Sequence, residues 1–195
     1  MSTNTAAGKT IHNDKVKNLV ITAFFTAITF SWNPVFQDSA SGSSRNTILH
    51  FGHIFVVMGL LLQGGKRGAV SGTLGLTIFD MLNGYMQDAP KTFVETALKC
   101  LIVGALFMML KKKTAGDKKK EYGAAMICAV VYGCINVIME FIMGTISMMI
   151  MGSGFAAAAV GAFTSLPATV INAVFMVIAI AVLYQPVKKI YVRMA

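Results

Sequence analysis

The sequence predicts an all-α integral membrane protein with six transmembrane helices and both termini in the cytoplasm. Three observations support this prediction. Hydrophobic residues make up 55% of the 195 residues, charged residues make up only 13%, and the basic residues gather between apolar segments. A soluble domain would carry about 25% charged residues, because one side of each of its elements faces water. Burial in a bilayer removes that requirement.

Six apolar segments approach the length of about 20 residues that a helix needs to cross the hydrocarbon of a bilayer. We expect these helices at residues 19–36, 48–63, 68–84, 92–110, 122–151 and 155–184. The second is short and the third is rich in glycine. The last two exceed the minimum length, so we expect them to tilt or to extend beyond the bilayer. The whole chain, residues 1–195, is expected to form a single transmembrane domain.

The basic residues predict the orientation of these helices. Six lysines fall between residues 111 and 120, and other basic residues lie near the N-terminus, at 66–67 and at the C-terminus. Cytoplasmic loops carry an excess of lysine and arginine. We therefore expect the polar N-terminus 1–18 and the basic loop 111–121 in the cytoplasm, and the polar loop 37–47 outside. This placement accounts for the net charge of +9 without a nucleic-acid partner.

Small residues mark two helix faces. Gly68, Gly72 and Gly75 lie on one side of the third segment, where the lack of side chains lets a neighbouring helix approach closely. Ala23 and Ala27 form a similar pair, four residues apart, on the first segment. Such pairs more often pack within their own protein than against a partner.

No motif indicates catalysis, metal binding or ATP hydrolysis. Each of the three cysteines lies within an apolar segment without metal-ligand spacing, and His50 and His53 have no carboxylate or cysteine nearby to complete a metal site. We interpret both histidines as structural or capping residues. The glycines before Lys66 do not have the spacing of a phosphate-binding loop. We expect no metal and no cofactor, and any ATPase must be another subunit.

Polar residues inside the apolar segments are the main candidates for a binding site, because each is costly in hydrocarbon. They are Asp80, Asn83, Glu95, Lys99, Asn136, Glu140 and Asn172. With the expected orientation they lie on four helices at a similar depth, in the middle and outer parts of the membrane. This predicts a polar pocket for a small hydrophilic molecule, open to the outside. Trp32, Asn33 and Arg45 are expected to border it.

Simpler interpretations of the same residues stay open. Glu95 and Lys99 are one helical turn apart and would neutralise each other, and Glu140 would do the same with Lys99 across helices. The 37–47 loop is either a solvated connection or a lid over the site. Asp80, Glu95 and Glu140 would supply acid–base groups to a membrane enzyme, although no nucleophile or metal cluster accompanies them.

The chain resembles the S components of energy-coupling factor (ECF) transporters, in the group that includes riboflavin, pyridoxine and hydroxymethylpyrimidine uptake subunits. The residues that carry the resemblance are the run 50–69, Gly72, Gly75, Asp80, Gly84, the run Ala-Pro-Lys-Thr at 89–92, Leu166-Pro167, Asn172 and the basic C-terminal end. The likeness extends over essentially the whole chain in helix number, order and length.

This resemblance implies a vitamin-binding subunit of the bacterial plasma membrane, without catalysis of its own. Its implied partners are a transmembrane coupling subunit and two ATPase subunits, and its implied motion is toppling in the membrane. Ala23 and Ala27 match the AxxxA docking pattern of the family, and 37–47 matches the substrate-gating loop.

The substrate is less well defined by the resemblance. One cation with several carboxylates and amides suits a neutral heterocycle, so we favour pyridoxine or hydroxymethylpyrimidine. Riboflavin and cobalamin remain alternatives. A self-sufficient secondary transporter is a further alternative, although the chain shows no obvious inverted repeat or broken helix pair.

Overall fold

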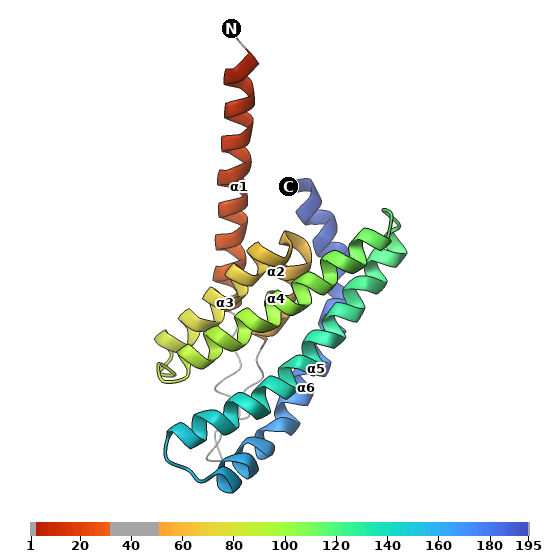
Figure 1. The fold of residues 1–195 in the computed structure, drawn as a ribbon. Coiled ribbons are helices and arrows are strands. Elements are labelled where there is room, and N and C mark those ends of the chain that lie inside the picture. Colours follow the sequence, from red (N-terminus) through yellow and green to blue (C-terminus); the bar gives the residue numbers. More distant parts are fainter. Residues whose placement is uncertain (1–2, 32–50, 195) are drawn as a thin grey trace.

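A computed structural model describes residues 3–31 and 51–194. These residues form six α-helices and no strand (Figure 1). The helices are α1 Thr3–Ser31, α2 Gly52–Gln63, α3 Gly65–Leu82, α4 Ala89–Lys113, α5 Lys118–Ile150 and α6 Phe155–Met194. The predicted all-α class and the order of six helices are confirmed for this part of the chain.

Two helices extend well beyond the apolar segments that predicted them. α1 begins at Thr3, within the polar stretch expected before the first helix, and α6 continues past Tyr184 to Met194. Lysine and arginine are good helix formers, so a helix that leaves the bilayer can continue through basic residues in water. α2 and α3 meet at a single residue, Gly64, whose φ of 87° is accessible to glycine at little cost.

Three of the described helices, α4, α5 and α6, are long and apolar enough to cross a membrane, and α2 is a shorter apolar helix. Their outer faces carry large apolar side chains. Ile138 on α5 is 58% exposed and Val160 on α6 is 66% exposed. A soluble monomer rarely exposes a continuous apolar surface of this kind, so these faces belong against lipid. The membrane class is confirmed, and passage of all six helices through the bilayer remains a prediction.

α2 lies at the centre of the bundle. With 12 residues it is about 18 Å long, too short to cross about 30 Å of hydrocarbon. Its residues Val56, Val57 and Leu60 are fully buried, and it contacts all five other helices. A helix that is apolar on every side requires such an enclosure.

The glycine face of α3 explains how the helices around α2 pack so closely. A side chain at Gly68 would collide with the backbone of Leu60, and one at Gly72 would collide with Val56. One at Gly75 would collide with α1. The predicted close approach of a neighbouring helix along these glycines is confirmed, and α2 and α1 are the neighbours.

The basic segments gather at one end of the molecule. Figure 1 shows the C-terminus, the α4–α5 turn and the α2–α3 turn at the end from which the first half of α1 projects. Arg67 donates a hydrogen bond to Asn18 of α1, and Glu121 at the start of α5 binds Lys188 of α6. We call this the basic end. Its existence meets the main requirement of the predicted orientation, namely that these segments share one side.

Candidate functional site

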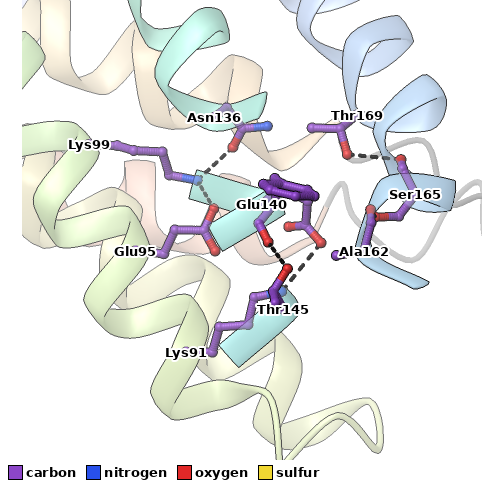
Figure 2. A network of polar contacts seen from close by, with 10 residues as sticks. Lys91, Glu95, Lys99, Asn136, Glu140, Thr145, Ala162, Ser165 and Thr169 are labelled. Carbon is purple, nitrogen blue, oxygen red and sulfur yellow. Dashed lines mark hydrogen bonds and ion pairs between the residues drawn. The ribbon is translucent and has the colours of Figure 1, made fainter. Parts of the chain in front are cut away.

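A buried ion pair links α4 to α5. The ammonium of Lys99 donates to Glu95 Oε1 at 2.9 Å and to Asn136 Oδ1 at 2.6 Å (Figure 2). The side chains of Lys99 and Glu95 are only 2% and 6% exposed. The same ammonium lies 5.7 Å from the centre of the Tyr132 ring, a distance that allows a cation–π contact. Lys99 therefore neutralises Glu95, as one of the two interpretations of the sequence expects.

A second ion pair joins α4 and α5 farther from the basic end. It lies about two turns from Lys99 on α4 and about one turn from Asn136 on α5. Lys91 Nζ lies 3.3 Å from Glu140 Oε1, with the two side chains 21% and 30% exposed. The sequence suggested Lys99 as the partner of Glu140, and that pairing is wrong. α4 and α5 are antiparallel. A residue that follows Asn136 on α5 therefore meets a residue that precedes Lys99 on α4.

Asp80 joins this polar region from α3, whereas Asn83 lies apart from it. Asp80 is buried and lies near Thr92, within electrostatic range of Lys91 and Glu95. Asn83 is exposed at the end of α3 and donates a hydrogen bond to the carbonyl of Phe79 in its own helix, at 2.8 Å. The expectation that the polar residues lie at a similar depth therefore fits Asp80 and the polar residues of α4 and α5 better than it fits Asn83.

A narrow crevice lies between α2, α5 and α6, and it leaves no space for even a water molecule. Its lining residues are His53, Tyr132, Gly133, Asn136, Asn172, Ala173 and Met176. Small-molecule sites usually measure about 300 Å³ or more, so the helices must separate before this crevice can hold a ligand. Asn136 belongs to both the crevice and the charged network, and Asn172 reaches the crevice from α6.

His53 and Tyr132 line this crevice, and neither was among the predicted site residues. His53 Nδ1 lies 3.1 Å from the Tyr132 hydroxyl, which joins α2 to α5. Tyr132 is fully buried. The spacing could have revealed Tyr132, because it lies four residues before Asn136 and so shares its helix face. No comparable signal points to His53, for which the sequence favours a structural or capping role.

Among the residues that the structure describes, the lining of the crevice carries no carboxylate, lysine or arginine. Behind Asn136, Lys99 is held by Glu95. The described part of the site therefore presents a histidine, a phenol and two amides to a ligand. These groups suit an uncharged molecule with several hydrogen-bonding atoms. Among the described residues, no group of three histidine, cysteine, aspartate or glutamate side chains could hold a metal ion.

The remaining candidates lie at the edge of the described structure or outside it. Trp32, Asn33, Arg45 and the 37–47 loop lie outside the described residues. Ala23 and Ala27 are both exposed on α1. Leu19 and Phe24 on that helix are 70% and 57% exposed. The alanine pair therefore lies on an apolar surface that the described helices do not cover.

An apolar helix bundle with a crevice lined in part by polar side chains is typical of a membrane-embedded binding protein. The sequence model described as "ECF-type riboflavin transporter, S component" matches residues 13–189, and the chain belongs to this family. The resemblance seen in the sequence is confirmed. The protein is a substrate-binding subunit for vitamin uptake, and its family is one of transport proteins rather than enzymes. No curated protein and no solved structure matches the chain.

Proposed function

We propose that this chain binds riboflavin in the crevice between α2, α5 and α6 and presents it for ATP-driven import. The proposal rests on the meeting of His53, Tyr132, Asn136 and Asn172 in one uncharged crevice within an apolar bundle. The description of the family supports riboflavin as the ligand. A flavin offers ring nitrogens, carbonyls and hydroxyls to such a lining, and it carries no charge that would need an ionic partner.

Pyridoxine or hydroxymethylpyrimidine, the ligand favoured from the sequence, is the second candidate. The narrowness of the crevice supports it, because a single-ring compound needs less separation of the helices than a three-ring flavin. Both candidates are uncharged heterocycles with hydroxyl groups, so the lining alone does not separate them.

The other predicted residues have different proposed roles around this crevice. Lys99 and Glu95 act through Asn136, whose amide oxygen Lys99 holds. We assign the remaining candidates to the outer part of the site. These are Asp80, Asn83, Glu140, Trp32, Asn33 and Arg45. We further propose that the basic end faces the cytoplasm, as the positive-inside rule requires. His53 lies near the start of α2, away from the Gly64 turn at the basic end, so the crevice lies toward the outer side.

Binding by the purified full chain tests the ligand. We expect quenching of riboflavin fluorescence on binding, with pyridoxine and hydroxymethylpyrimidine as weak competitors. Asn172→Leu removes a polar group from the crevice and should weaken binding about 10-fold, the effect of one or two lost hydrogen bonds. Asn83→Leu, in the outer part of the site at the exposed end of α3, should weaken binding less than Asn172→Leu does.

Other outcomes would point to a different ligand, a different site or a different kind of transporter. Tight binding of pyridoxine or hydroxymethylpyrimidine without riboflavin binding would support the second candidate. Loss of binding in Asn83→Leu but not in Asn172→Leu would move the site to the end of α3. Uptake by the isolated chain in vesicles, without ATPase partners, would indicate a self-sufficient transporter and contradict the proposal.

We also propose that Ala23 and Ala27 form the docking face for the transmembrane coupling subunit of a complex with two ATPases. Ala23→Leu with Ala27→Leu should lower uptake by the full complex at least about 10-fold while riboflavin binding stays unchanged, because bulky side chains prevent close helix contact. Ala105→Leu, at an exposed alanine of α4, should leave uptake unchanged. Loss of binding in the α1 variant would instead show that the pair packs within this subunit.

A further inference from the structure

Six lysines flank the turn between α4 and α5, and we call them the basic hairpin. They are Lys111, Lys112, Lys113, Lys118, Lys119 and Lys120. All six are exposed. Among the ion pairs of the described residues, only Lys111 takes part, at 3.8 Å from Glu121. The surface of the basic hairpin is therefore strongly positive.

The two acidic residues near the basic hairpin are already engaged. The Asp117 carboxylate accepts hydrogen bonds from the backbone N–H groups of Lys119 and Lys120, which caps α5. Glu121 is buried and accepts hydrogen bonds from Lys188 and from the Tyr184 hydroxyl. Neither carboxylate is available to neutralise most of the exposed ammonium groups.

The last turns of α6 add a second observation beside the basic hairpin. Lys188, Lys189 and Arg193 alternate there with the apolar residues Ile190 and Val192, which are 56% and 64% exposed. The Glu121–Lys188 contact holds this part of α6 against the start of α5.

Exposed apolar residues also reach the basic hairpin along α4. Met109 is 64% exposed and lies within about one turn of Lys111 and Lys113. Basic and apolar side chains at the same level are typical of the boundary between headgroups and hydrocarbon, where the stems of lysines lie in the apolar layer and their charges reach the headgroups. An acidic soluble protein would neutralise the charges but would leave these apolar side chains uncovered.

We propose that the basic hairpin and the C-terminal turns of α6 together bind the headgroups of anionic phospholipids. The ligand chemistry is a lipid phosphate with net negative charge, such as that of phosphatidylglycerol. A basic residue near an anionic membrane surface strengthens attraction about five-fold, and this attraction weakens as salt is added. The proposal does not depend on the vitamin that the crevice binds.

The test compares full-length variants in nanodiscs of mixed phosphatidylglycerol and phosphatidylcholine, with native mass spectrometry to identify the lipids that stay bound. The wild type should retain phosphatidylglycerol preferentially. Changing Lys112, Lys113, Lys118, Lys119 and Lys120 together to glutamine should reduce that preference at least about 10-fold. The same five positions changed to arginine keep the charge and should keep the preference. Helical content by circular dichroism checks that each variant is folded.

Several results would overturn this inference. One is equal retention of the two lipids by the wild type, and another is an unchanged preference in the glutamine variant. Loss of the preference in the arginine variant would also contradict it, because charge would then not be the cause. If the glutamine variant lost only its association with the ATPase and coupling subunits, the basic hairpin would be a protein-binding surface instead.

Discussion

Replacing Lys99 by methionine should lower the free energy of unfolding by about 3 kcal/mol or more. Its ammonium neutralises Glu95 at 2.9 Å, and both side chains are almost completely buried. Removing one partner of a buried pair leaves an uncompensated charge, and this costs about 3–5 kcal/mol. Unfolding of the purified chain in detergent, followed by circular dichroism during titration with a denaturing detergent, measures the change.

A double variant separates the effect of an unpaired Glu95 from the effect of losing Lys99 itself. Adding Glu95→Gln to Lys99→Met removes the uncompensated charge and should restore much of the lost stability. Lys91→Met breaks the partly exposed pair with Glu140 and should cost no more than about 1 kcal/mol. If the double variant is no more stable than Lys99→Met, the buried charge of Glu95 is not the source of the effect.

Lys99→Met also tests the role that we propose for this residue at the site. If Lys99 acts by holding the amide of Asn136, riboflavin binding should weaken in Lys99→Met. It should weaken in the double variant as well, even though stability returns. Unchanged binding in both variants would leave Lys99 with a structural role only.

Replacing Gly68 by alanine should destabilise the protein by about 1–3 kcal/mol, and Gly68→Val should have a larger effect. A Cβ atom at this position would lie 2.6 Å from the Leu60 nitrogen and 2.8 Å from the Gly59 carbonyl carbon. These are backbone atoms and cannot rotate away. α2 and α3 must therefore separate, although the single residue Gly64 joins them. Thermal unfolding in detergent measures the loss.

Gly123 provides the matched control for Gly68. It lies within α5, and a Cβ added there would have no neighbour within 4 Å. Gly123→Ala should therefore keep or raise stability, by up to about 1 kcal/mol, because alanine is the better helix former. Equal stability of Gly68→Ala and Gly123→Ala would show that the α2–α3 contact is looser than described.

The class of protein could be predicted from the sequence because hydropathy depends on composition alone. A chain with 55% hydrophobic and 13% charged residues must hide its surface in lipid, and this requirement does not depend on how the helices pack. The glycines of α3 could likewise be interpreted from spacing, since a face without side chains has little use other than close packing. Helix ends were predicted less well. α1 and α6 continue as helices through basic residues that hydropathy assigns to water.

The partners of the polar residues were decided only by the tertiary structure. Periodicity along one helix identified Glu95 and Lys99 as neighbours, and this pair formed. It did not show that Lys99 would meet Asn136 or that Glu140 would meet Lys91. Those contacts depend on the register between the antiparallel helices α4 and α5, which only the tertiary packing determines. The contact of His53 with Tyr132 has the same origin, because residues 79 positions apart meet only when α2 lies inside the bundle.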